Sequence, residues 1–125
     1  MKDPEDFINK IYCGNFFEVE KGLPSGFVDL IITSPPYNVG IDYDGFNDCL
    51  SKEDYLLFLD EFVKRSKRLL KPDGRFAAVV PGGVGRNPYI PIAYKLDAQQ
   101  NCMGKLEISI LPRPSRYVRA DNNCP

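Results

Sequence analysis

A strand pattern runs directly into a proline turn in Val28-Asp29-Leu30-Ile31-Ile32-Thr33-Ser34-Pro35-Pro36-Tyr37-Asn38. The first five of these residues are rich in β-branched side chains and carry one charge, which is typical of a buried strand in a mainly parallel sheet. The two prolines have no N–H to donate to a neighbouring strand, so the strand must end before them. The turn therefore stands at the carboxyl end of a strand, the edge where open α/β sheets bind their ligands.

The flanking sequence predicts further strands and helices in alternation. Short strands are expected over residues 9–13 and 75–80, and helices over residues 16–21 and 51–71, with a Pro-Asp-Gly turn after the second helix. The second helix has Ser51 as its N-cap and acidic residues before basic ones, an order that complements the helix dipole. Its apolar stripe includes Tyr55, Leu59, Phe62 and Leu69. This alternation predicts an α/β fold.

The turn and its neighbours resemble one enzyme family. Thr33-Ser34-Pro35-Pro36-Tyr37-Asn38 is similar to the catalytic motif of the DNA amino-methyltransferases, which is Asp, Asn or Ser followed by Pro-Pro and an aromatic residue. The resemblance extends to Ile11-Tyr12-Cys13-Gly14-Asn15 and to Leu70-Lys71-Pro72-Asp73-Gly74-Arg75-Phe76, and covers roughly residues 8–100. It implies a partial Rossmann-like methyltransferase fold, with a mainly parallel sheet flanked by helices. The implied reaction moves a methyl group from S-adenosyl-L-methionine to the amino group of cytosine (N4) or adenine (N6) in DNA.

The resemblance assigns catalytic roles to Ser34, Pro35, Pro36 and Tyr37. An exocyclic amino group is a poor nucleophile because its lone pair is delocalised into the ring, so acceptors must hold its hydrogens. Ser34, beside both base and cofactor, offers its hydroxyl oxygen, and the Pro35 carbonyl, held rigidly by the prolines, offers a second acceptor. Tyr37 would stack on a base flipped out of the duplex. For an isolated Ser-Pro-Pro-Tyr, a plain strand-ending turn would be an equal alternative.

Two further segments gain roles from the same resemblance. Gly14 and Asn15 would bind the adenosine end of the cofactor, although a turn followed by a helix N-cap explains them equally well. Asn38 and Tyr43 belong to the loop 38–50, which in the family closes over the substrate base. Both are therefore candidates for substrate binding, and a solvated loop is the alternative. A serine at the first motif position leans toward cytosine as the target base.

Residues 1–100 thus form the expected partial catalytic domain, and residues 101–125 depart from the family. Within the second part, residues 105–110 alternate like an edge strand, and the proline-rich remainder is expected to be disordered. The sequence contains no Phe-x-Gly-x-Gly, the loop that wraps the methionine part of the cofactor, and has no room for a target-recognition region. The chain alone is therefore expected to bind cofactor weakly or not at all. The alternative to an enzyme is an inactive truncated module that binds nucleic acid or a partner.

Composition excludes several other classes. The chain has 125 residues, one domain's length, and a net charge of −1, so no overall basic field draws it to DNA. It has no histidine and four scattered cysteines, which argues against a metal site and for free thiols. A phosphate loop is missing, which disfavours a nucleotide hydrolase. With no long apolar run and no signal-peptide pattern, we expect a cytoplasmic protein without membrane contact. Open edges of a truncated sheet favour a homo-oligomer.

Overall fold

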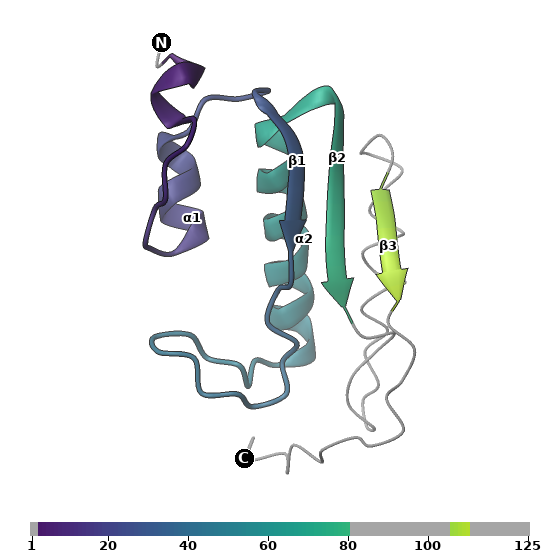
Figure 1. Ribbon diagram of the computed structural model, residues 1–125. Helices are drawn as coiled ribbons and strands as arrows, with labels where there is room; N and C mark the ends of the chain where they lie inside the picture. The colour runs from purple at the N-terminus through teal and green to yellow at the C-terminus, as the bar shows by residue number, and fades with distance from the viewer. Residues whose placement is uncertain (1–2, 81–105, 111–125) are drawn as a thin grey trace.

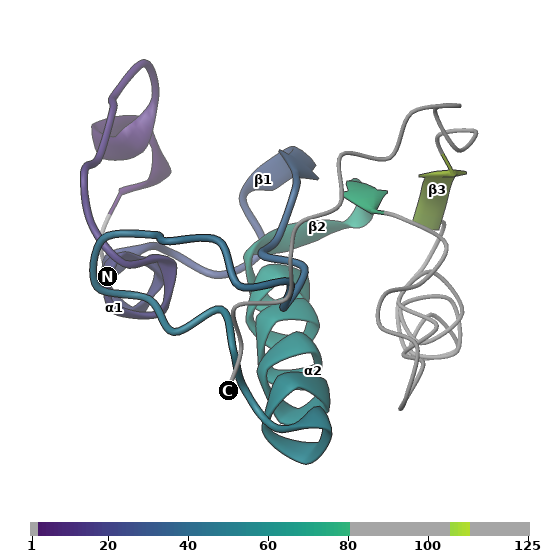
Figure 2. The ribbon, with the colours of Figure 1, turned by 90° about the horizontal axis from the view of Figure 1, so that it is seen from below.

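Three parallel strands form the sheet of the computed structural model (Figure 1), which describes residues 3–80 and 106–110. The strands are β1 (Val28–Thr33), β2 (Leu70–Val80) and β3 (Leu106–Ile110), and β2 lies in the middle. Helix α2 (Lys52–Leu69) connects β1 to β2 and lies on one side of the sheet (Figure 2). This arrangement confirms the predicted α/β fold with a parallel sheet flanked by helices.

Short helices precede the sheet. They are η1 (Pro4–Phe7), α1 (Phe16–Val19) and η2 (Glu20–Gly22), and the last two together form the helix predicted over residues 16–21. At the other end of the chain, the edge strand predicted over residues 105–110 is present as β3. The tail predicted to be disordered, residues 111–125, lies outside the described residues.

The strand predicted over residues 9–13 is absent. This segment is a turn followed by irregular chain, in which Asn9 has a φ of 57° and Ile11 is fully exposed. A strand is stable only when its N–H and C=O groups pair with a neighbouring strand. None of the described strands pairs with this segment, so its apolar pattern alone does not make it a strand.

The predicted Pro-Asp-Gly turn lies inside β2 as an irregularity and does not precede it. Leu70 pairs with Val28 and Arg75 pairs with Leu30, so the residues between Leu70 and Arg75 bulge out of the ladder. The bulge accommodates a proline, which cannot donate a ladder hydrogen bond. Gly74 is needed there, because a Cβ at this position would lie 3.0 Å from two backbone carbonyl oxygens.

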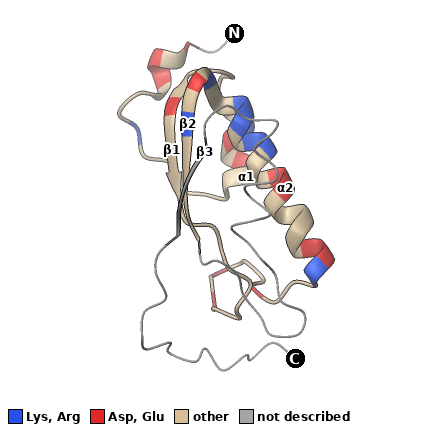
Figure 3. Ribbon diagram, turned by 90° about the vertical axis from the view of Figure 1, so that its right-hand side faces the viewer, with Lys and Arg blue, Asp and Glu red and all other residues tan. Residues whose placement is uncertain are grey.

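The core lies between α2 and one face of the sheet. Its buried side chains are Tyr55, Leu59, Phe62 and Val63 of α2 and Phe76, Ala78 and Val80 of β2. The opposite face of the sheet carries Leu30, Ile32 and Val79, which are 50%, 70% and 36% exposed. No described helix covers this second face (Figure 3).

Ser66 is a polar exception in the core. Its side chain is fully buried, and its Oγ has no hydrogen-bond partner in the described part of the chain. A buried polar group without a partner costs about 1–3 kcal/mol. We therefore expect Ser66→Ala to raise the free energy of unfolding by about 1 kcal/mol, measured by urea denaturation.

The matched control is another serine of the same helix. Ser51 caps α2 by accepting a hydrogen bond from the Asp54 N–H at 3.1 Å. Ser51→Ala should therefore lower the free energy of unfolding by about 1 kcal/mol. A loss of stability in both variants would show that the Ser66 hydroxyl contributes to the fold.

Candidate active site

The Ser-Pro-Pro-Tyr turn lies at the carboxyl ends of two neighbouring strands. It follows Thr33, the last residue of β1, and Thr33 pairs with Ala78 near the end of β2. Both strands point to the same edge of the sheet (Figure 1). Ser34 is exposed at this edge, and Pro35 behind it is buried.

A chain of hydrogen bonds ties the turn to the next strand. The Tyr37 hydroxyl donates to the Val79 carbonyl oxygen at 2.8 Å and lies 2.7 Å from Ser34 Oγ. A phenol has a single O–H, so the hydrogen between the two hydroxyls comes from Ser34. The Ser34 oxygen therefore keeps its lone pairs available as an acceptor at the open edge of the sheet.

A buried tyrosine of α2 also holds this turn. The Tyr55 hydroxyl, on α2, donates to the Pro36 carbonyl oxygen at 2.7 Å, and the Tyr55 side chain is fully buried. Burial raises the pKa of Tyr55 most, and the negative charge of Asp48 raises it further, so the hydroxyl is a donor at neutral pH. The helical pattern places Tyr55 only in the apolar stripe. The available signal was that a buried tyrosine needs a partner for its O–H.

Asn38 and Asp48 close the base of the loop 38–50. The buried Asp48 carboxylate accepts the backbone N–H groups of Asn38, Val39 and Ile41 at 2.9–3.0 Å. Asn38 uses both ends of its side-chain amide on the backbone of Leu50: Nδ2 donates at 2.9 Å and Oδ1 accepts at 2.7 Å. Asn38 thus has a structural role in the loop, and its contact with substrate stays a prediction.

Removing the Asp48 carboxylate should loosen this loop. We expect Asp48→Ala to speed hydrogen exchange of the Asn38, Val39 and Ile41 amides by about tenfold, because their charge-assisted acceptor is lost. The measurement is amide exchange by NMR, with Asp44→Ala as control, since Asp44 is exposed in the same loop. Unchanged protection in Asp48→Ala would show that the loop is held by other contacts.

Tyr43 lies in a tight turn of the same loop. It forms an isolated bridge with Phe46, and the two rings contact at 6.3 Å between centroids. Burial raises the pKa of Tyr43 most, and the negative charge of Asp48 raises it further. Substrate binding by Tyr43 stays a prediction.

Gly14 and Asn15 lead into α1. Asn15 Oδ1 accepts the Phe17 N–H at 2.9 Å, so the residue caps this helix, as the alternative interpretation of the sequence holds. A Cβ at Gly14 would lie 3.1 Å from a Val19 methyl carbon, so the turn is closely packed. The segment before α1 lies near the level of the carboxyl end of β1 (Figure 1). No hydrogen bond within the described residues joins Asn15 to Ser34.

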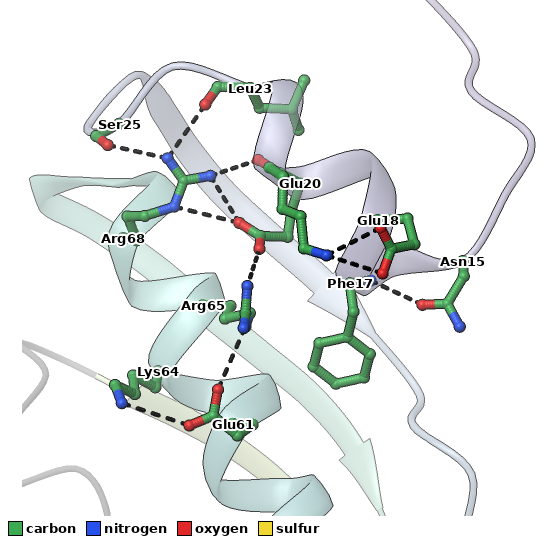
Figure 4. Close-up of polar contacts among 11 residues, drawn as sticks. Asn15, Phe17, Glu18, Glu20, Leu23, Ser25, Glu61, Lys64, Arg65 and Arg68 are labelled. Atoms are coloured by element: carbon green, nitrogen blue, oxygen red, sulfur yellow. Dashed lines mark hydrogen bonds and ion pairs between the residues drawn. The ribbon is translucent and has the colours of Figure 1, made fainter.

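A buried carboxylate ties η2 to α2 (Figure 4). Glu20 has a side chain 2% exposed, and its two oxygens lie 2.6 Å from Arg65 Nη1 and 2.7 Å from Arg68 Nη2. Arg68 also donates to the backbone carbonyls of Glu20 and Leu23 and to Ser25 Oγ. Burial raises the pKa of Glu20, but the hydrogen bonds and charges of the two arginines outweigh it, so the net pKa is lowered. We call these three side chains the Glu20 clasp.

The described residues form neither a metal site nor a membrane-spanning helix. The described residues contain no group of three or more side chains that could hold a metal ion. No helix in the described ranges is long and apolar enough to cross a bilayer. Cys13 is free and exposed, but Cys49 is disulfide-bonded, so the prediction of four free thiols was wrong for Cys49. The wide spacing of cysteines in a sequence does not fix their distances in the fold.

Comparison with known sequences identifies the class to which this fold and turn belong. The sequence model of the DNA methylase family matches residues 28–101, which include β1, the Ser-Pro-Pro-Tyr turn, α2 and β2. The chain belongs to this family of N6-adenine and N4-cytosine DNA methyltransferases. The family that the motif and its flanking sequence predicted is thereby confirmed.

Similar proteins carry names consistent with that family. Type II methyltransferase M.MjaVI of Methanocaldococcus jannaschii is 48% identical over 74 residues, which cover 59% of this chain and 38% of that protein. Type II methyltransferase M.HpaI of Haemophilus parainfluenzae is 42% identical over 65 residues, 52% of this chain and 21% of that protein. DNA adenine methyltransferase YhdJ of Escherichia coli K12 is 35% identical over 75 residues, 58% of this chain and 26% of that protein. The chain thus spans less than two fifths of each. No solved structure matches it significantly.

Proposed function

We propose that this chain carries the methyl-transfer centre of a DNA methyltransferase, which moves a methyl group from S-adenosyl-L-methionine to an exocyclic amino group of cytosine or adenine. The hydrogen-bond chain from Ser34 through Tyr37 to the Val79 carbonyl is the observation that carries the proposal. It leaves an exposed serine oxygen as an acceptor at the carboxyl edge of a parallel sheet, where ligands of such sheets bind.

The chemistry requires acceptors that are fixed before the base arrives. Ser34 Oγ would accept one hydrogen of the amino group, and the Pro35 carbonyl would accept the other. With both hydrogens held in one plane, the nitrogen lone pair is directed toward the methyl group. The Tyr37 ring would stack on the flipped base, a contact worth about 1–3 kcal/mol. The nitrogen would bond to the methyl carbon as the bond from that carbon to sulfur breaks, S-adenosyl-L-homocysteine would leave, and the methylated amino group would lose one proton to water. This step needs orientation of the amino group and no general base with a shifted pKa.

S-adenosyl-L-methionine supplies the methyl group when bound, and Gly14, Asn15 and Ser34 are the residues proposed to contact it. The structure fits this role in part. The helix cap occupies Asn15 Oδ1, and the amide nitrogen of the same side chain can donate to a hydroxyl of the cofactor. Asn15 offers no carboxylate, so the contact would be a neutral hydrogen bond.

Cytosine is the proposed target, because serine holds the first position of the motif, and adenine is the alternative. DNA is the proposed substrate, although the described residues show no broad basic region in Figure 3. Basic side chains gather at the C-terminal end of α2 (Figure 3), and two of them, Arg65 and Arg68, are paired with Glu20. These two arginines at the end of α2 therefore stabilise the fold, and DNA must be bound chiefly by other residues.

The test is methyl transfer itself. The chain is incubated with methyl-labelled S-adenosyl-L-methionine and mixed-sequence duplex DNA, and the digested DNA is separated to identify the labelled nucleoside. N4-methylcytosine is expected, and N6-methyladenine would change the target while keeping the reaction. A parallel calorimetric titration with the cofactor shows whether it binds. Absence of transfer under conditions where cofactor and DNA both bind would overturn the proposal in favour of a binding module.

A further inference from the structure

We propose that Tyr55 is a positioning residue for methyl transfer: its hydroxyl fixes the Pro36 carbonyl, and through it the Pro35 carbonyl that holds the amino group. This inference rests on the proposed function. Tyr55 lies on α2, outside the Ser-Pro-Pro-Tyr turn, and its ring contacts none of the reacting atoms directly. Its hydroxyl reaches the turn through one hydrogen bond of 2.7 Å to Pro36 O.

The geometry of two successive prolines makes this bond effective. The Pro35–Pro36 peptide group is planar, and the Pro36 ring locks φ on its other side. The Pro35 carbonyl therefore moves almost as one rigid unit with Pro36. The unit is joined to β1 at one end, and the Tyr55 hydroxyl anchors it at the other. Only the ψ angle of Pro36 lies between this unit and the anchored carbonyl, so loss of the hydrogen bond gives both the carbonyl and the unit more freedom to move.

The surroundings of Tyr55 make the anchor rigid. Its side chain is fully buried and belongs to the core between α2 and the sheet. Its ring stacks on Phe58, with centroids 6.0 Å apart and an interplanar angle of 18°. The phenol therefore has one position from which to donate. The opposite side of the turn is held separately by the Tyr37 hydroxyl on the Val79 carbonyl, so two hydroxyls hold the turn from two elements.

The test is Tyr55→Phe, which keeps the ring and removes only the donor. In the chain labelled with 13C, we expect the Pro36 carbonyl signal and the amide signals of Tyr37 and Asn38 to shift, while signals from β2 stay in place. This readout needs no catalysis. An unchanged Pro36 signal would overturn the inference, because it would show that the hydroxyl does not hold that carbonyl.

The second readout is the rate of transfer under steady-state conditions, which gives kcat and KM. We expect Tyr55→Phe to lower kcat by about tenfold, with KM for DNA and cofactor little changed, because one hydrogen bond that orients the acceptor is lost. Val63→Ala is the control, since Val63 is a buried residue eight positions further along the same helix, and its truncation removes packing but no hydroxyl group. An equal fall of kcat in both variants would reduce Tyr55 to a structural role.

The two readouts separate this inference from the proposed function. If the unaltered chain binds cofactor and DNA but transfers no methyl group, the proposed function fails, and the carbonyl signal still decides whether Tyr55 holds Pro36. If the chain is active and Tyr55→Phe shifts the carbonyl without lowering kcat, the proposed function stands and the positioning role is overturned.

Discussion

Ser34→Ala is expected to lower the methyl-transfer rate constant by about 100-fold, by analogy with the loss of one fixed hydrogen-bond partner of a reacting group. Ser34 is the exposed member of the hydrogen-bond chain, and its oxygen is the acceptor that alanine removes. The loss should appear in kcat, because the acceptor acts on the amino group as its lone pair is released. The measurement is single-turnover transfer of labelled methyl groups to DNA.

Tyr37 supplies the comparison within the same turn. Tyr37→Phe keeps the ring and removes the hydroxyl that donates to Val79, so it should cost much less than Ser34→Ala. Tyr37→Ala removes the ring as well, and with it a stacking contact worth about 1–3 kcal/mol, which should appear in the affinity for DNA. Unchanged transfer in both alanine variants would sink the assignment of this turn as the catalytic motif.

Glu20→Gln is expected to lower the free energy of unfolding by about 2 kcal/mol, the scale for hydrogen bonds to a charged group, because solvent partly screens the two arginines left behind. The Glu20 side chain is 2% exposed and accepts hydrogen bonds from both Arg65 and Arg68. A neutral amide leaves Arg68 without a charged partner among the described residues and leaves Arg65 only the exposed Glu61. Urea denaturation measures the change. Glu61→Gln is the control, because Glu61 also pairs with Arg65 but is 44% exposed, and its loss should have little effect.

The pH dependence gives a second measurement on the Glu20 clasp. The pKa of Glu20 in the folded chain lies below its ordinary value of 4.5, so the folded state holds the ionised form more strongly than the unfolded state does. The stability from this group is therefore complete above about pH 4.5 and is lost as the pH falls through the folded pKa. The difference between wild type and Glu20→Gln should shrink over that acidic range. A difference that stays constant there would contradict the ionic origin of the clasp.

Local patterns were sufficient to predict most of the described fold. β1 and α2 follow from a β-branched run and from an apolar stripe with a serine cap, signals that depend on neighbouring residues. The strand expected over residues 9–13 failed because a strand also needs a partner, which is a property of the whole sheet. The turn expected after α2 became a bulge for the same reason: the ladder from Leu70 to Val28 forms ahead of the proline.

The candidate site likewise has one part that the sequence predicted and one part that it did not. The sequence located Ser34 and Tyr37 at a strand end, because prolines end a strand in any fold. The groups that hold the turn could not be located, because Tyr55 donates across 19 positions and the Val79 carbonyl accepts across 42. Every residue has a backbone carbonyl, so the sequence does not show which one accepts a hydrogen bond. The role of Asp48 in holding the loop could not be predicted either, because one acidic residue in an acidic loop resembles its neighbours.

The face of the sheet that no described helix covers, with Leu30, Ile32 and Val79, affects how the chain behaves in bulk solution. Contiguous apolar surface makes molecules adhere to one another once they are concentrated. Warming and sulfate strengthen that attraction, whereas cold and low concentrations of such salts weaken it. Yield, shelf life and the concentration reached in a spectrometer tube will therefore depend on these three side chains as well as on the stability of the core.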